Sequence, residues 1–162
     1  MSIQRVREYL AAFGADDRIR EFDVSSATVP LAAKALGCEE GRIAKTLSFM
    51  SGEKVVLVVA AGDVKIDNRK YKDFFKCKAK MLPVGEAEAL TGHAVGGVCP
   101  FAVNEGVEVW LDESLKRFNT VFPACGSANS AIELSVRELE KFSRAKGWTD
   151  VCKSAELPVG EV

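Results

Sequence analysis

Histidine and long apolar runs are scarce in this sequence of 162 residues. The chain has one histidine, His93, and its longest uncharged apolar run, from Val55 to Gly62, is far shorter than the roughly 20 residues that cross a bilayer. The amino terminus also lacks the basic segment followed by apolar residues that is typical of a secretory signal. We therefore expect neither a membrane span nor export, and predict a cytoplasmic protein.

The cysteines lack the pattern of a structural framework. There are five, an odd number, and no two of them lie close together in the sequence. Disulfide scaffolds and zinc clusters both require paired spacings, so the sequence argues against either. We expect a reducing compartment and no metal.

Composition is that of one compact domain. With 162 residues, of which 48% are hydrophobic and 28% charged, a single domain over residues 1–162 buries roughly 70% of the surface of the unfolded chain. The net charge of −1 does not decide whether nucleic acid is a partner, because binding depends on where the charges lie.

Periodicity predicts alternating helices and strands. Ile3, Val6, Leu10 and Phe13 recur at helical spacing and Gly14 follows as a stop. Further helices are expected over residues 30–36, 68–76 and 84–90, and strands over residues 18–24, 42–50, 54–61, 107–111, 120–123 and 131–134. Ser135 and Glu138 form a capping box for a last helix, after which only a frayed tail is expected. The pattern predicts an α/β or α+β domain with a mixed sheet around one core.

A glycine-rich loop holds the first candidate site. Adjacent glycines, Gly96 and Gly97, allow close approach of the backbone to a ligand, and Pro100 restricts Cys99 to extended conformations. The amides of Gly97, Val98 and Cys99 are therefore candidates to converge on a carbonyl oxygen or a developing oxyanion. An ordinary surface turn is the alternative.

A lysine within an apolar segment is the second feature. Lys45 lies between Ala44 and Thr46 in a stretch that leads into the run beginning at Val55. A lysine in such a place is expected to face a cleft or to extend outward to water.

Together these segments resemble the YbaK and prolyl-tRNA-synthetase-associated editing-domain family, which hydrolyses mischarged aminoacyl-tRNA in trans. The resemblance extends from about Ser25 to Leu139 and depends on the order and spacing of its pieces. Those pieces are Ser25-Ser26-Ala27-Thr28, Ile43-Ala44-Lys45-Thr46-Leu47, Gly62-Asp63, Thr91-Gly92, the Gly-x-x-x-Pro loop at 96–100, and Ile132-Glu133-Leu134-Ser135.

The resemblance implies a single curved mixed sheet flanked by helices, with a cleft between the lysine strand and the glycine loop. Lys45 would then lie opposite residues 96–100, anchor a phosphate or a ribose hydroxyl of the terminal adenosine, and stabilise negative charge. The loop residues would polarise the ester carbonyl: Gly96, Gly97, Val98, Cys99 and Pro100. No cofactor is needed for this chemistry, and the attacking group is water or a group of the substrate.

Other residues are candidates for binding the substrate, each beside a structural alternative. Thr46, His93 and Phe101 are candidates for the wall or rim of the pocket, although Phe101 and His93 can equally be core residues. Ser127 and Asn129 are pocket polar groups or turn residues. Some family members that act on cysteinyl-tRNA have Asp where this chain has Ala131, which leaves the acyl specificity open.

A cysteine and histidine six residues apart also suggest a thiol hydrolase. Cys99 would be the nucleophile and His93 its base. Sequence spacing does not establish such a pair, since catalytic pairs are recognised by their geometry in space. A small loop residue at position 99, whose amide is what matters, is the preferred interpretation.

Seven cations fall within sixteen residues between Lys65 and Lys80, against two acidic residues. Such a cluster is suited to the phosphates of an RNA acceptor stem, or else is a solvated helix face. Residues proposed to contact RNA are Lys65, Arg69, Lys70, Lys72 and Lys76.

The leading hypothesis is a stand-alone hydrolase that removes a wrong amino acid from tRNA, which the resemblance implies is tRNA for proline. Its partners would be aminoacyl-tRNA and an aminoacyl-tRNA synthetase. The competing hypotheses are a non-catalytic module that binds aminoacyl-tRNA or a synthetase, and a thiol-dependent ester hydrolase.

Overall fold

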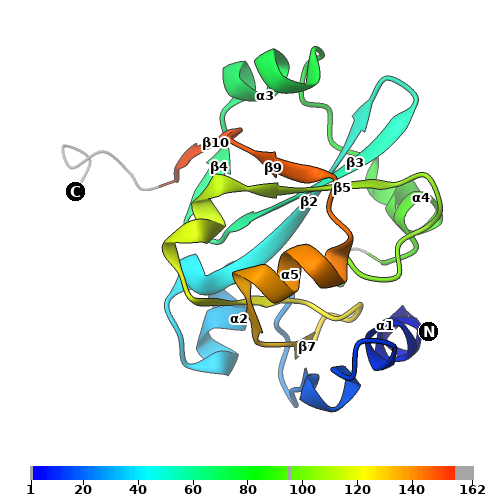
Figure 1. The fold of residues 1–162 in the computed structure, drawn as a ribbon, viewed down its shortest axis with the longest axis vertical. Coiled ribbons are helices and arrows are strands. Elements are labelled where there is room, and N and C mark those ends of the chain that lie inside the picture. Colours follow the sequence, from blue (N-terminus) through cyan, green and yellow to red (C-terminus); the bar gives the residue numbers. More distant parts are fainter. Residues whose placement is uncertain (1, 95, 156–162) are drawn as a thin grey trace.

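The computed structural model describes residues 2–94 and 96–155 (Figure 1). The helices are α1 (Ser2–Ala11), α2 (Val29–Leu36), α3 (Asn68–Phe75), α4 (Ala87–Thr91) and α5 (Val136–Ser143). Short 3₁₀ helices are η1 (Asp16–Arg18), η2 (Glu40–Arg42), η3 (Val84–Glu86) and η4 (Glu113–Arg117). The strands are β1 (Arg20–Glu21), β2 (Ile43–Ser51), β3 (Lys54–Ala61), β4 (Val64–Ile66), β5 (Glu108–Asp112), β6 (Thr120–Pro123), β7 (Ser130–Ala131), β8 (Leu134–Ser135), β9 (Gly147–Thr149) and β10 (Cys152–Ser154).

A curled six-stranded mixed sheet forms the centre of the domain, as the resemblance implied. Its strand order is β8-β6-β2-β3-β5-β9. The β2–β3 and β6–β8 pairs are antiparallel, and the other three are parallel. Two short antiparallel pairs, β1–β7 and β4–β10, lie apart from it. The expected α/β domain with a curved mixed sheet is therefore confirmed.

The long hairpin of β2 and β3 confirms the pair of strands expected over residues 42–50 and 54–61. Ser51 pairs with Lys54, and Gly52 makes the turn with a φ of 66°. Every residue from Val55 to Ala61 is buried. A strand between two others, covered on both faces, is uniformly apolar rather than alternating, which explains this run.

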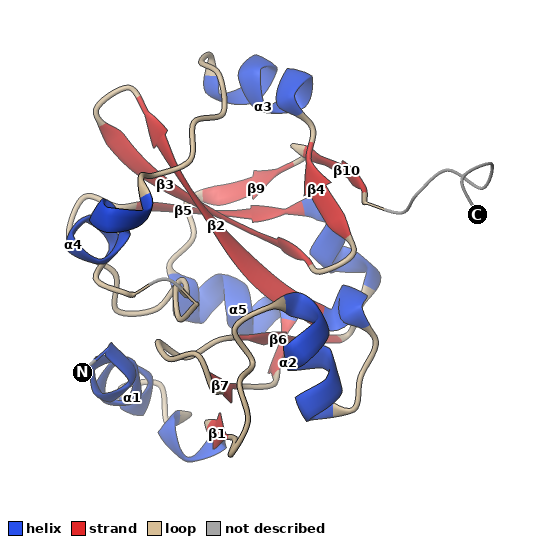
Figure 2. Cartoon of the chain, turned by 180° about the vertical axis from the view of Figure 1, so that it is seen from behind, coloured by secondary structure: helices blue, strands red, loops and turns tan. Residues whose placement is uncertain are grey.

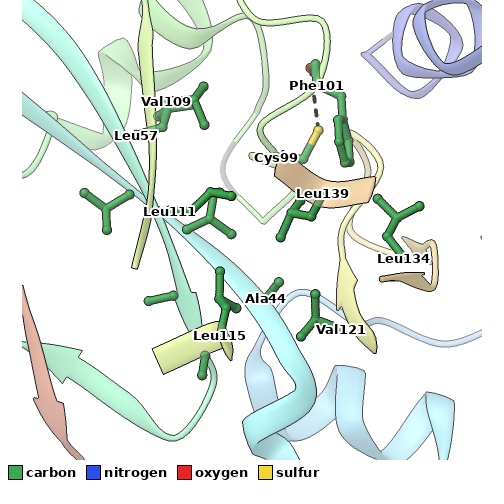
Figure 3. Packing of buried hydrophobic residues seen from close by; sticks show 14 of the residues in the cluster. Ala44, Leu57, Cys99, Phe101, Val109, Leu111, Leu115, Val121, Leu134 and Leu139 are labelled. Atoms are coloured by element: carbon green, nitrogen blue, oxygen red, sulfur yellow. Dashed lines mark hydrogen bonds between the residues drawn. The ribbon is translucent and has the colours of Figure 1, made fainter. Parts of the chain in front are cut away.

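The main core lies between the sheet and helices α1 and α5. Leu57, Leu111 and Leu139 meet there with no exposed surface (Figure 3). Helix α5 lies in front of the sheet in Figure 1, whereas α2 is in front when the molecule is seen from behind (Figure 2). Under α2 is a smaller cluster, formed by Ala32, Ala33, Ile43 and Phe122.

Local capping signals place the helix ends. The Thr28 hydroxyl accepts a hydrogen bond from the Leu31 amide at the start of α2, and Gly37 ends that helix with a φ of 70°. Ser135 and Glu138 form the expected capping box of α5. No helix in the described ranges is both long and apolar enough to span a bilayer.

The prediction that the chain ends in a helix is wrong. Strands β9 and β10 follow α5, and β9 pairs in parallel with β5 while β10 pairs with β4. Strands of three residues are too short to show alternation, and Gly147 was interpreted as a helix stop although it begins β9.

Three other predicted elements are shorter or divided. The strand expected over 18–24 is limited to β1, because its partner β7 has only two residues. The strand expected over 131–134 is split between β7 and β8, which pair with different neighbours. The helix expected over 84–90 is η3 followed by α4.

The capping box predicts an acid-sensitive contribution to stability. Arg18 donates to both Glu138 carboxylate oxygens, at 2.8 and 3.1 Å, and this pairing together with the bond from the Ser135 amide lowers the Glu138 pKa from 4.5 to about 2. Because the folded pKa is depressed, the stabilisation is present above pH 4.5 and is lost as the pH falls towards about 2.

We expect Glu138→Gln to be less stable than the wild type at neutral pH, and the difference to shrink steadily below about pH 4.5. Urea unfolding at a series of pH values measures it. Glu140→Gln, on the same helix and outside the ion pairs of the described residues, is the control. A difference independent of pH would contradict the assignment.

Candidate active site

A pocket of about 270 Å³ lies where β2 meets three loops. Lys45, Thr46 and Ser48 of β2 form one wall, and Gly96 and Val98 of the glycine loop form part of another. The remaining lining residues are small or apolar for the most part: Ser26, Ala27, Thr28, Val29, Ala32, Ile43, Ala44, Met81, Leu82, Ala87, Phe122, Ala124, Ser130 and Ala131.

Lys45 is half-buried in this pocket and its ammonium group is held by main-chain oxygens. Nζ donates to the Val64 carbonyl and, at 3.5 Å, to the Gly62 carbonyl. Burial lowers the Lys45 pKa, and the nearby Asp63 carboxylate and Cys152 thiol act in the opposite direction. The side chain therefore supplies a fixed cationic donor beside an apolar cavity, where electrostatic interactions are stronger than in water.

The glycine loop lies beside Lys45 at the same pocket, the arrangement that the resemblance implied. Gly96 has a φ of 90°, and a Cβ added there would lie 3.4 Å from the Ala27 Cβ. Gly97 packs against the backbone of Gly126 and Ser127. The Gly97 amide donates to the Ala94 carbonyl at 3.0 Å, so it is already engaged within the loop. A role as oxyanion donor therefore remains a prediction for the amides of Val98 and Cys99.

Hydrogen bonds join two further loops at the pocket. The Ser26 amide donates to the Ala128 carbonyl at 2.6 Å, and Asn129 Nδ2 donates to the Phe22 carbonyl at 2.9 Å. Ser127 Oγ is 3.0 Å from Asn129 Oδ1, to which it donates, and 2.7 Å from Ser130 Oγ, from which it accepts. Asn129 thus joins the two loops and Ser127 bonds within its own loop, and neither lines the pocket, whereas Ser130 and Ala131 do.

His93, Cys99 and Phe101 lie in the core, away from the pocket lining. His93 Nε2 is 2.7 Å from the Phe101 carbonyl oxygen, and its Nδ1 bonds to Ser2 Oγ. Cys99 Sγ is 3.6 Å from His93 Nε2. It is 3.7 Å from the Phe101 carbonyl oxygen, the contact drawn as a dashed line in Figure 3.

The Cys99 and His93 side chains do meet, but in a setting that suppresses thiolate chemistry. Burial raises the Cys99 pKa to about 12 and lowers the His93 pKa. A reactive cysteine needs a depressed pKa and access to solvent. This geometry gives no support to a thiol-dependent hydrolase that uses Cys99.

Pro100 faces a second cavity, behind the loop, which is larger at about 610 Å³. Arg5, Tyr9 and Arg144 also line it. The smaller pocket is the candidate active site, because Lys45 and the loop glycine Gly96 both line it.

The predicted RNA-binding residues lie on β4 and α3 or directly after α3, at the end of the domain opposite α1 (Figure 1). Lys65, Arg69, Lys72 and Lys76 are exposed. Lys70 is exposed as well but is engaged by Asp150 at 3.1 Å and by the Cys152 carbonyl at 3.0 Å.

A groove of about 450 Å³ lies beside α3, and its lining includes three cations, Arg69, Lys72 and Lys78. The chain runs from this groove directly to the pocket. The Lys80 carbonyl accepts a hydrogen bond from the Met50 amide, and Met81 and Leu82 then line the pocket. The basic segment and the candidate active site are therefore adjacent.

Several pocket residues gave no signal in the sequence. Ser48, Met81, Leu82, Ala87 and Ala124 reach the pocket only through folding. Thr46, which was expected to bind substrate, does line it, and its buried Oγ1 has no hydrogen-bond partner. Within the described residues, no group of three or more His, Cys, Asp or Glu side chains is arranged to hold a metal ion.

Comparison with known proteins places the same segments within one family. A family model described as an aminoacyl-tRNA editing domain matches residues 24–142. "Uncharacterized protein YwhH" of Bacillus subtilis (strain 168) is 53% identical over 157 residues, which cover 96% of this chain and all of that protein.

Two further relatives carry names that describe an activity. "Putative Cys-tRNA(Pro)/Cys-tRNA(Cys) deacylase EbsC" of Enterococcus faecalis (strain ATCC 700802 / V583) is 32% identical over 106 residues, 64% of each protein. The "crystal structure of a putative trans-editing enzyme for prolyl tRNA synthetase" superposes with a TM-score of 0.85 at 28% identity, covering 94% of this chain and 98% of that one.

The packing of Gly97 predicts that the loop does not tolerate a side chain there. A Cβ would lie 2.8 Å from the Gly126 carbonyl carbon and from the Ser127 nitrogen, which are backbone atoms and cannot rotate away. We expect Gly97→Ala to lower the free energy of unfolding by about 1–3 kcal/mol, as overpacking does.

Chemical denaturation of the purified variant measures this effect. Gly85→Ala is the matched control, because nothing lies within 4 Å of a Cβ added at Gly85. Equal stability of Gly97→Ala and Gly85→Ala would show that the loop is not packed as described.

Proposed function

Because the chain belongs to the aminoacyl-tRNA editing domain family, we propose that it acts in trans to remove a wrong amino acid from tRNA for proline. The enzyme class is aminoacyl-tRNA deacylase, which hydrolyses the ester between the amino acid and the terminal ribose. The observation that carries the proposal is the position of Lys45 at a small pocket, beside Gly96 and Val98 of the glycine loop.

Ester hydrolysis needs an oriented nucleophile and stabilisation of the negative charge that develops on the carbonyl oxygen. The amides of the glycine loop supply hydrogen-bond donors, each typically worth about 10²- to 10³-fold in rate. The Lys45 ammonium anchors a phosphate or a ribose hydroxyl of the terminal adenosine and stabilises the developing charge. The attacking group is a water molecule or a group of the substrate, so this mechanism requires neither a protein nucleophile nor a cofactor.

The small volume and apolar lining of the pocket support a small or medium amino acid as the substrate. Ala27, Ala32 and Ala124 provide methyl groups, and Ala131 adds another where some family members have a carboxylate. Cysteine and alanine both suit such a lining, and the name of the Enterococcus faecalis relative favours testing cysteinyl-tRNA first.

The groove beside α3 is the proposed path of the tRNA backbone. Arg69, Lys72 and Lys78 converge on it, and the same segment continues into the pocket wall at Met81. A tRNA whose 3′ end enters the pocket can place acceptor-stem phosphates against these cations. We propose that Lys65 and Lys76 extend this surface, and that the protein works in the cytoplasm beside prolyl-tRNA synthetase.

The role of Lys45 is tested with tRNA for proline charged separately with alanine, serine, cysteine and threonine. We expect selective loss of one ester, and a fall in rate of at least about 100-fold for Lys45→Ala, because the variant lacks the cation beside the reacting ester. Lys54→Ala, on the same hairpin but outside the pocket, should keep the wild-type rate. Binding of these tRNAs without any ester loss would instead indicate the non-catalytic module.

The RNA path is tested by the salt dependence of tRNA binding. We expect Lys72→Ala to weaken binding to all tRNAs alike and to reduce the slope of log K against log salt by about 1, since one phosphate contact is lost. Lys141→Ala, on α5 and far from α3, is the matched control (Figure 1). An unchanged slope for Lys72→Ala would exclude the groove from the RNA interface.

A further inference from the structure

The turn that follows β3 holds the oxygens to which Lys45 donates. Gly62 and Asp63 join β3 to β4, and the Gly62 and Val64 carbonyls are the two acceptors of the Lys45 ammonium group. Any movement of this turn therefore moves the ammonium group relative to the pocket.

A bidentate ion pair ties this turn to η4. Arg117 Nη1 donates to Asp63 Oδ2 at 3.0 Å and Nη2 donates to Oδ1 at 2.5 Å, while Nε donates to the Ser114 carbonyl at 2.9 Å. Two parallel bonds between a guanidinium and a carboxylate fix orientation as well as distance. The Ser114 hydroxyl also accepts a hydrogen bond from the Ala61 amide. Helix η4 is therefore bonded both to the last residue of β3 and to Asp63 in the turn that follows it.

Helix η2 closes the turn from another side, with no room for side chains. A Cβ added at Gly62 would lie 2.1 Å from the Glu40 carbonyl oxygen. One added at Gly41 would approach Asp63 Oδ2 to 3.0 Å and the Phe118 ring to 2.8 Å. The turn is thus confined between η2 and η4, and the Arg117–Asp63 ion pair joins it to η4.

The Arg117–Asp63 ion pair also affects the charge of Lys45. Two ionisable side chains oppose the effect of burial on the Lys45 pKa: Cys152 of β10 and Asp63. Burial lowers the Lys45 pKa and the Asp63 carboxylate acts against that effect, while Arg117 is the main cause of the lowered Asp63 pKa.

We propose that Asp63 and Arg117 are positioning residues for Lys45, which fix the carbonyls that hold its ammonium group and supply the carboxylate that balances its charge. The inference rests on the proposed role of Lys45 in deacylation. Neither residue lines the pocket, so both act through Lys45 and not on the substrate.

The two residues have opposite charges, which gives their variants opposite signatures. Removing the carboxylate in Asp63→Asn should lower the Lys45 pKa, whereas removing the cation in Arg117→Ala should raise it. Both variants should lower kcat, by about 10- to 100-fold for a displaced catalytic group, with a smaller change in KM. A purely structural defect in the two variants would not shift the Lys45 pKa down in one of them and up in the other.

The experiment combines deacylation kinetics with a carbon-13 NMR titration of the Lys45 side chain, assigned by its absence from Lys45→Ala. Arg117→Lys, which keeps the charge but not the fork geometry, should restore the wild-type titration and recover only part of kcat. Glu113→Gln breaks the neighbouring Lys116 pair on η4 and should change neither quantity.

The proposal is overturned if Arg117→Ala and Asp63→Asn leave kcat and the Lys45 titration at wild-type values, or shift the titration in the same direction. The proposed function would be refuted if the wild-type protein deacylates no tRNA. The positioning of Lys45 would still be supported if its pKa falls in Asp63→Asn and rises in Arg117→Ala. If Asp63→Asn does not fold, the two Arg117 variants still test the proposal. The Lys45 pKa should rise in Arg117→Ala and return to the wild-type value in Arg117→Lys.

Discussion

The ladder between β2 and β3 fixes where Lys45, the proposed active-site lysine, lies. Its eight residue pairs set Lys45 opposite Ala60, near the end of β3 and within reach of the carbonyls that follow it. Because side chains alternate along a strand, a slip of one residue would turn Lys45 to the opposite face and bring Ala44 or Thr46 into its place. The short turn at Gly52, which closes the ladder at the Ser51–Lys54 pair, opposes such a slip, since the turn fixes the register of a hairpin.

Burial of the lysine is unfavourable in itself, and the surrounding structure compensates for it. Taking an ammonium group partly out of water is costly unless its donors are satisfied and a counter-charge is near. Two main-chain carbonyls and the Asp63 carboxylate meet these needs, and Arg117 and η2 confine the turn that carries them. The cation can then face a small apolar pocket, where its field is weakly screened.

Local sequence signals located much of the fold and part of the site. The two strands on either side of Gly52 and the Ser135–Glu138 capping box depend on neighbouring residues and were predicted correctly. Strands β9 and β10 were missed because each has only three residues, too few to show alternation. Lys45 and Gly96 do meet at the pocket, whereas burial in the core separates His93, Cys99 and Phe101 from its lining, a difference that one sequence cannot reveal.

By itself, the sequence determined the class of fold, the central hairpin and the resemblance to editing domains, because periodicity, caps and motif order are properties of short segments. Only the tertiary structure decided which side chains share a cavity. Met81, Ala124 and Ala131 come from distant segments, and Asn129 joins two loops through its bond to the Phe22 carbonyl. The ion pair between Arg117 and Asp63, 54 positions apart in the sequence, likewise depends on the parallel pairing of β3 with β5, which brings η4 beside the end of β3.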